Sequence, residues 1–246
     1  MSNKPILKAE KIKKVFGGLV AVKDVELELA QDEILGLIGP NGAGKTTMFN
    51  VIAGALKPNT GKITFNGMDI TNKRPDQRCR LGIARTFQIT KPFKNMSLLE
   101  NVMVGAYFGT ERKNLASVRR KAEEILEFVG LGDIKKLEAK SLSIGNLKKL
   151  ELARALATDP KVLLLDEVIG GLTPSEGNEV VEIIKKIKNS GVAIIMIEHV
   201  MKAVMGVSDR IVVLNYGEVL AEGTPKEISE NPLVIEAYLG GIRQYA

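Results

Sequence analysis

The stretch from Gly39 to Thr46 constrains this chain more than any other. It reads GPNGAGKT and matches the phosphate-binding pattern G-x-x-x-x-G-K-[ST]. Glycines let the main chain approach a phosphate closely, while backbone N–H groups and a lysine supply donors and a hydroxyl can reach a metal ion. The residues expected here to bind a nucleoside triphosphate are Gly39, Asn41, Gly42, Gly44, Lys45, Thr46 and Thr47.

The residues on either side of this loop have the pattern that such a loop needs. An apolar run over 34–38 precedes it, and Met48, Phe49, Val51 and Ile52 mark an apolar face after it. This predicts a buried strand, the loop and then a helix, whose positive N-terminal end would face the phosphates. A chance glycine-rich turn would not need that context.

Two further apolar runs end in ionisable pairs. Val162 to Leu165 is followed by Asp166-Glu167, and Val192 to Ile197 is followed by Glu198-His199. Short continuous apolar runs are typical of parallel strands covered on both faces, and open α/β sheets bind ligands at the carboxyl ends of such strands. Asp166 is therefore a candidate for holding Mg²⁺, and Glu167 for orienting or deprotonating an attacking water.

The rest of the pattern predicts an α/β fold, with a P-loop core, a mixed sheet and an inserted helical lobe. Alternating residues over 25–29 and a run over 63–65 indicate strands in the first third. Between about 91 and 158 the signals are helical: Ser97 and Glu100 form a capping box, and Ser143 is a candidate N-cap. Thr173 and Glu176 form another capping box, which opens a helix after the run that ends at Leu165. We expect one domain over 1–246, containing that lobe and a C-terminal helical extension over about 224–246.

Composition narrows the cellular setting without selecting a partner. The net charge of +6 permits phosphate ligands, acidic lipid or nucleic acid, although aromatic residues make up only 4% and Trp is absent. The single cysteine, Cys79, excludes an internal disulfide and fits a reducing compartment. Neither a signal peptide nor an apolar run of roughly 20 residues is present, so membrane contact is expected only through a partner.

The order of motifs resembles the ATP-binding cassette family over almost the entire chain. GPNGAGKT resembles its Walker A motif, VLLLDE at 162–167 its Walker B motif, and LSIGN at 142–146 its signature. This resemblance implies ATP and Mg²⁺ as cofactors, with Thr46, Gln88 and Asp166 at the metal. It also implies that Gln88 senses metal and water, that His199 contacts the γ-phosphate, and that Phe16 stacks on adenine.

The same resemblance implies a head-to-tail pair with a second ATPase subunit, identical or different. ATP on one Walker A motif would be covered by Ser143 and Gly145 of the other copy. Four residues depart from the usual pattern: Ile144 and Asn146 in the signature, Val168 after the catalytic Glu, and Thr173 in the D-loop. The last two bear on communication across the dimer rather than on nucleotide binding.

Three further segments resemble one subfamily and indicate an importer. RTFQ at 85–88, LLENVMVGAYFG at 98–109 and EAYLG at 236–240 are similar to ATPase subunits of branched-chain amino-acid uptake systems. By that analogy, transmembrane permease subunits dock near Arg85 to Tyr107, and the chain is peripheral on the cytoplasmic face of the cell membrane.

Three alternatives remain open from the sequence. An export-type cassette for a lipopolysaccharide-like substrate has a similar ending but fits the segment after Gln88 less well. A soluble cassette acting on nucleic acid would usually carry two cassettes or a coiled-coil insertion, so nucleic acid is not expected. A P-loop kinase or GTPase would not account for LSIGN or His199.

Overall fold

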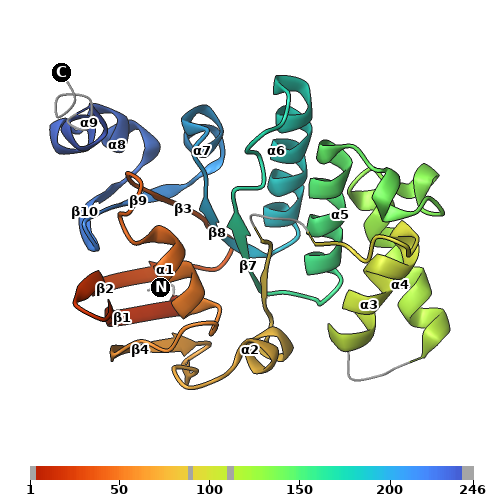
Figure 1. The fold of residues 1–246 in the computed structure, drawn as a ribbon, viewed down its shortest axis with the longest axis horizontal. Helices are drawn as coiled ribbons and strands as arrows, with labels where there is room; N and C mark the ends of the chain where they lie inside the picture. The colour runs from red at the N-terminus through yellow and green to blue at the C-terminus, as the bar shows by residue number, and fades with distance from the viewer. Residues whose placement is uncertain (1–3, 88–90, 110–113, 240–246) are drawn as a thin grey trace. The chain divides into compact units, whose positions relative to one another are not determined.

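The structure, a computed structural model, describes residues 4–87, 91–109 and 114–239. The chain divides into two compact units (Figure 1). The first consists of Met1–Pro75 with Ala193–Ala246, and the second of Asp76–Val192. The phosphate-binding stretch and the final helices therefore belong to the first unit, and the segments around Ser143 and Asp166 belong to the second.

An antiparallel sheet forms the N-terminal part of the first unit. It is built from β1 (Leu7–Phe16), β2 (Leu19–Leu29), β4 (Thr60–Phe65) and β5 (Met68–Asp69). Their order is β2-β1-β4-β5, and each neighbouring pair is antiparallel. The predicted alternation in β2 is confirmed, because Val25, Leu27 and Leu29 are buried between exposed glutamates. β1 was not predicted, since its lysines obscure the period-two pattern.

The second set of strands in this unit carries the functional loops. It contains β3 (Ile34–Ile38), β8 (Ala193–Ile197), β9 (Arg210–Asn215) and β10 (Glu218–Gly223). β3 runs parallel to both β8 and β9, whereas β9 and β10 form an antiparallel hairpin, so the predicted mixed sheet is present. Every residue of β3 and β8 is buried, as expected for strands covered on both faces.

The helices of the first unit are short. They are α1 (Lys45–Ile52), α7 (Met201–Val207), α8 (Pro225–Glu230) and α9 (Pro232–Leu239). Thr224 begins α8 with a capping box to Glu227, and proline at the first helical position has a φ already suited to a helix. Asn231 accepts a hydrogen bond from the Leu233 N–H at 2.9 Å at the start of α9.

The second unit contains a parallel strand pair and most of the longer helices. β6 (Ile83–Arg85) pairs with β7 (Val162–Asp166), and α2 (Pro75–Leu81) precedes β6. The remaining helices are α3 (Leu98–Gly109), α4 (Leu115–Phe128), α5 (Ile144–Leu156) and α6 (Pro174–Asn189). α3, α4 and α5 pack against one another (Figure 1). β6 was not predicted, because three residues carry too little pattern to be recognised.

The predicted helix starts in this unit are confirmed. The Ser97 N–H donates to Glu100 at 2.7 Å and the Glu100 N–H donates back to the Ser97 hydroxyl at 3.2 Å, ahead of α3. Thr173 and Glu176 make the same reciprocal pair at α6, and Ser143 caps α5. The limits proposed for a helical lobe and a C-terminal extension stay predictions. Across the described ranges, every helix is too short or too polar to span a bilayer.

Candidate functional site

The phosphate-binding stretch connects β3 directly to α1, as predicted. β3 ends at Ile38 and α1 begins at Lys45, so the intervening loop is Gly39 to Gly44. Gly39, Gly42 and Gly44 have φ values of 150°, 79° and 100°. Residues with a Cβ rarely adopt such positive φ values, so these glycines set the path of the loop.

Two of these glycines lie directly against the backbone of neighbouring strands. A Cβ on Gly39 would lie 2.1 Å from the Leu214 carbonyl oxygen in β9, and one on Gly44 would lie 2.5 Å from the Ala21 carbonyl oxygen in β2. The Gly217 N–H, in the β9–β10 turn, also donates to the Ala43 carbonyl at 3.1 Å. The loop is therefore held by two strands and a turn, with no room for side chains at these contacts.

Lys45 lies within the curve of the loop that precedes it. Its ammonium donates to the Gly39 carbonyl at 2.6 Å and to the Pro40 carbonyl at 2.9 Å, and the residue is only 7% exposed. A buried lysine is uncommon unless it has partners. These contacts place a positive charge among the backbone groups of the loop, where an anion would be attracted.

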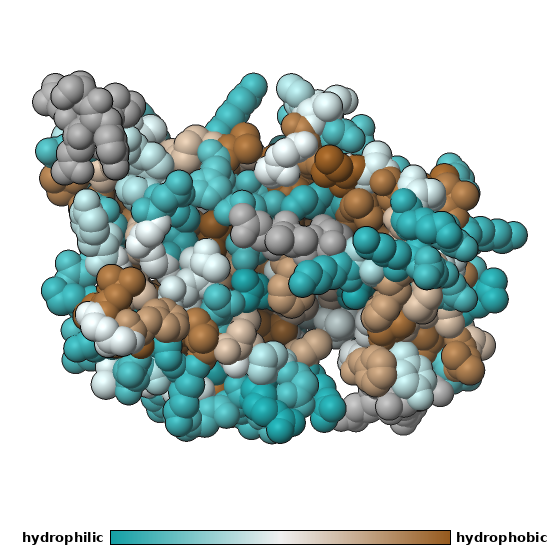
Figure 2. All heavy atoms as spheres, in the orientation of Figure 1, coloured by the Kyte–Doolittle hydropathy of each residue, from teal (hydrophilic) through white to brown (hydrophobic). Residues whose placement is uncertain are grey.

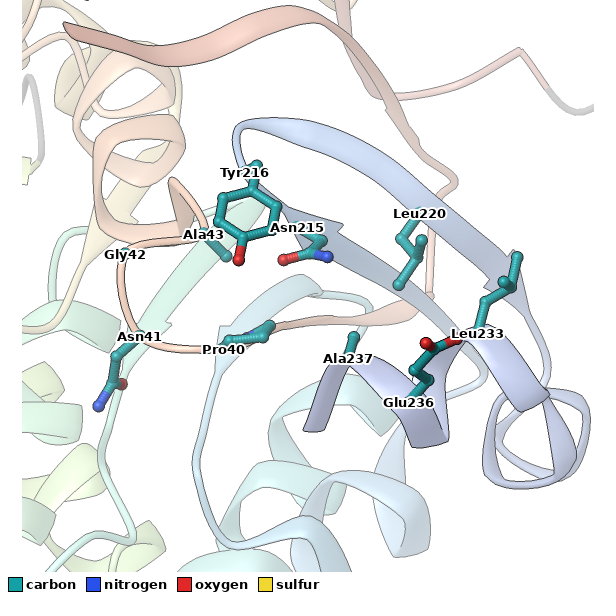
Figure 3. Close-up of a pocket in the computed structure, with 10 residues that line it drawn as sticks. All are labelled: Pro40, Asn41, Gly42, Ala43, Asn215, Tyr216, Leu220, Leu233, Glu236 and Ala237. Carbon is teal, nitrogen blue, oxygen red and sulfur yellow. The ribbon is translucent and has the colours of Figure 1, made fainter. Parts of the chain in front are cut away.

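The outer side of the loop faces the C-terminal helix. A hollow of about 600 Å³ lies between the loop, the β9–β10 turn and α9, and Figure 3 shows the residues that line it. Its lining residues are Pro40, Asn41, Gly42, Ala43, Asn215, Tyr216, Leu220, Leu233, Glu236 and Ala237. Burial raises the pKa of Tyr238 on α9, and a hydrogen bond from the Gly39 backbone opposes that rise. The C-terminal helix therefore contacts the first glycine of the loop.

His199 emerges at the same sheet edge as this loop. β3 and β8 are parallel neighbours, with Ile34, Leu35 and Gly36 opposite Ile194, Ile195 and Met196. Their carboxyl ends therefore lie side by side, one continuing into the loop and the other into Glu198 and His199. Glu198 is buried, whereas His199 is exposed.

The remaining nucleotide candidates of this unit are accessible. Asn41, Gly42 and Thr46 are exposed, and Thr47 is half-buried. Phe16, the last residue of β1, is 44% exposed and is therefore not a core residue. The Lys14 ammonium lies 5.2 Å from its ring centroid. Phe16 pairs with Leu19 of β2, the strand whose Ala21 carbonyl borders Gly44.

In the second unit, Asp166 ends β7 and is almost fully buried. Arg85, at the end of the neighbouring parallel strand β6, donates to its carboxylate at 2.7 Å. The Asp166 N–H donates to the Thr86 hydroxyl at 3.0 Å, which fixes the end of the strand. Sequence reasoning missed Arg85 as a partner of Asp166, because the signal lay in the register of β6, a strand that was not predicted.

Glu167 follows Asp166 immediately and has an unusual backbone conformation. It is half-buried and has a φ of 50°, in the left-handed region that glutamate rarely enters. Val168 after it is fully buried, so this departure from the family pattern fills the core. Thr173, the other departure in this segment, forms the N-cap of α6 and therefore has a structural role.

The signature segment forms the start of α5. Ser143 is exposed and its hydroxyl accepts a hydrogen bond from the Asn146 N–H at 3.3 Å, while Ile144 is 60% exposed. Gly145 is buried, and a Cβ there would lie 2.5 Å from a carboxylate oxygen of Glu176. The Thr173 N–H and hydroxyl that hold Glu176 lower its pKa. Packing against Glu176 therefore gives Gly145 a structural reason to be glycine.

The structure thus groups the candidates within each unit. Phe16, the residues from Gly39 to Thr47 and His199 belong to the first unit, whereas Ser143, Gly145, Asp166 and Glu167 belong to the second. Gln88 lies outside the described residues.

The residues of the loop fit a triphosphate, and each unit carries an oxygen group suited to a magnesium ion. Glycines with positive φ, a buried lysine and a helix N-terminus without an acidic residue in its first turn together favour an anion. The Thr46 hydroxyl and the Asp166 carboxylate are hard oxygen ligands of the kind that Mg²⁺ prefers.

Two family models match the chain. A model described as ABC transporter matches residues 22–170, and one described as Branched-chain amino acid ATP-binding cassette transporter matches residues 218–242. The first match spans the phosphate-binding loop, the signature and β7. The second covers β10 and α9, the elements beside the outer face of the loop.

Curated relatives match nearly the whole chain. One is the high-affinity branched-chain amino acid transport ATP-binding protein LivG of Salmonella typhimurium, 42% identical over 97% of this chain and 99% of the relative. Another is the probable LivG protein of Archaeoglobus fulgidus, 40% identical over 96% of this chain and 95% of the relative.

Solved structures show the same fold. The ADP conformation of an ATP-binding cassette of an ABC transporter has a TM-score of 0.88 and 35% identity, covering 96% of this chain and 99% of that one. A dimeric cassette in a post-hydrolysis state, bound to ADP and phosphate, has a TM-score of 0.80 and 26% identity, covering 89% and 98%.

These matches confirm the fold class predicted from the sequence and the resemblance to branched-chain amino-acid transport ATPases. The chain therefore belongs to the ABC transporter family, as one of its ATP-binding cassette ATPases.

Proposed function

We propose that this chain is the motor subunit of a membrane importer for branched-chain or related amino acids. In this proposal two copies, or one copy and a similar subunit, close head-to-tail around two ATP molecules and drive transmembrane subunits. The observation that carries ATP use is the loop from Gly39 to Gly44 with the Lys45 ammonium held inside it. The named relatives and the match over 218–242 support the substrate class.

Each residue has a chemical role in this proposal. Backbone N–H groups of the loop and the Lys45 ammonium bind the phosphates, while Phe16 contacts the adenine. Thr46, Asp166 and Gln88 would hold Mg²⁺, which would supply positive charge beside the phosphates. Glu167 orients or deprotonates the attacking water, and His199 contacts the γ-phosphate. In phosphoryl transfer most of the catalysis comes from positioning and charge neutralisation, so this set of groups suffices.

The signature segment completes the site from the other copy. Ser143 is exposed at the N-terminus of α5, where backbone N–H groups of the first turn and the helix dipole favour a negative charge. Ile144 is exposed beside it and would be covered on closure. The solved dimeric cassette with ADP and phosphate supports a paired arrangement for this chain.

An apolar groove on the helices of the second unit supports a permease partner. It has a volume of about 240 Å³ and is lined by Met96, Glu100, Met103, Val104, Tyr107, Phe108, Leu115 and Val118. Figure 2 shows hydrophobic side chains gathered over α3 and α4. Part of the groove falls within the segment from Arg85 to Tyr107, where the family resemblance places the permease contact. Peripheral attachment to the cytoplasmic face of the membrane follows from such docking.

The groove gives a test of the partner. Met103→Asp places a carboxylate among apolar groove residues, so permease recovered with the tagged chain should fall by at least about tenfold. The matched control is Met68→Asp, at a half-exposed methionine on β5 that does not line the groove. The measurement is co-purification with the permease subunits of the same transport system, alongside ATPase activity of the isolated chain. Equal permease recovery with both variants would place the contact elsewhere.

The transport assignment is tested by uptake in cells that lack this chain. Labelled leucine uptake should return with the wild-type chain and stay at background with Lys45→Ala, because import requires ATP binding by the motor. Uptake of an unrelated sugar serves as the control for general membrane energisation. Normal leucine uptake in the cells without the chain, under conditions where its transport system is expressed, would contradict this substrate class.

A further inference from the structure

The backbone of Glu167 needs support from its surroundings. Its φ of 50° places a residue with a long side chain in the left-handed region, which is disfavoured because Cβ approaches the carbonyl oxygen. Such conformations persist where neighbouring groups hold them, and they occur often at functional sites. The direction in which the Glu167 side chain leaves the backbone depends on this conformation.

A lysine from α5 holds that backbone. The Lys148 ammonium donates to the Glu167 carbonyl oxygen at 2.8 Å, and Lys148 is only 7% exposed. A hydrogen bond from an ionised donor is stronger than one between neutral groups, so this contact resists rotation of the peptide after Glu167. The next lysine, Lys149, has a different partner. Its ammonium pairs with the exposed Glu179 carboxylate at 2.6 Å.

α5 also contacts the backbone just before Gln88. Glu151, one turn after Lys148 and also buried, accepts a hydrogen bond from the Phe87 N–H, next to Gln88 in the sequence. α5 therefore supplies two buried charged side chains that hold backbone, one at Glu167 and one just before Gln88. Its first turn carries the signature segment. Ordinary surface charges on a helix would not be buried in this way.

We propose that Lys148 is a positioning residue for ATP hydrolysis, acting by fixing the Glu167 backbone so that its carboxylate points where water is activated. This inference rests on the proposed role of Glu167. Removing the ammonium frees the Glu167 peptide to rotate, which misplaces the carboxylate without touching the loop that binds the phosphates. Hydrolysis should then slow while ATP binding is retained.

The test is steady-state ATP hydrolysis by the purified full chain, with ATP affinity measured separately. Lys148→Met keeps the length and apolar stem of the side chain, and its kcat should fall on the order of 10- to 100-fold with KM unchanged. Lys148→Arg keeps a charged donor and should recover most of that loss. Lys149→Met is the matched control and should stay within about twofold of wild type, because Lys149 pairs with Glu179 and not with the Glu167 backbone.

The outcomes distinguish failure of the role proposed for Lys148 from failure of the role proposed for Glu167. If Glu167→Gln is inactive but Lys148→Met keeps wild-type kcat, the positioning role is wrong and the role of Glu167 stands. If Glu167→Gln hydrolyses ATP normally, the role of Glu167 and this inference both fail. A fall in kcat that Lys148→Arg does not rescue, or an equal weakening of ATP affinity, would also overturn it. Should Lys148→Met fail to fold, Lys148→Gln, which keeps a shorter neutral donor, is measured against the same expectations.

Discussion

Glu167→Gln is expected to lower ATP turnover by about 10²- to 10⁴-fold while leaving ATP affinity close to wild type. The amide has nearly the same shape as the carboxylate, so packing at the end of β7 is kept, but it cannot accept a proton from the attacking water. Phosphate binding is assigned to other residues, in the loop from Gly39 to Thr46. The measurement is phosphate release per subunit, with ATP affinity by calorimetry.

Glu182→Gln is the matched control for this variant. Glu182 lies on α6, is largely exposed and pairs with Lys185, so the same chemical change there should leave turnover unaltered. Turnover by Glu167→Gln equal to that of Glu182→Gln would show that the carboxylate after β7 does not serve hydrolysis.

Lys45→Ala is expected to weaken ATP binding by about 10- to 100-fold, the range given by losing a hydrogen bond from a charged donor. The Lys45 ammonium is buried within the loop and bonded to the Gly39 and Pro40 carbonyls, so the substitution removes a positive charge from the loop itself. Calorimetric titration with ATP measures the affinity, and the thermal midpoint without nucleotide checks that the variant is folded.

Lys57→Ala, which removes an exposed lysine outside the loop, is its control. Wild-type ATP affinity in Lys45→Ala would contradict the assignment of Gly39 to Thr46 as the phosphate-binding loop.

Much of the fold could be predicted because its signals are local. The apolar run of β3, the glycines after it and the apolar face of α1 occupy one short stretch, and each agrees with the others. The capping boxes at Ser97 and Thr173 also act over three residues, so reading them requires no tertiary information. By contrast, β6 is recognisable only from its register with β7, which brings Arg85 to Asp166.

The site was predicted less completely than the fold. Residue types and spacing identified the loop, Asp166 and Glu167, but burial of a lysine cannot be read from a helix that carries two adjacent lysines. Lys148 and Lys149 differ only in what the packed unit places around them. Likewise, the contact of Gly145 with Glu176 depends on how α5 and α6 pack. The roles of all the candidate site residues stay predictions, as do the limits of the helical lobe.

ATP-dependent pairing of two copies is the central claim, and the mass of Glu167→Gln in solution tests it most directly. Light scattering after gel filtration should give the mass of one subunit without nucleotide and twice that mass with saturating Mg²⁺ and ATP, because bound ATP is no longer hydrolysed and joins the two copies. The mass of one subunit at an ATP concentration shown to fill the site would contradict the account.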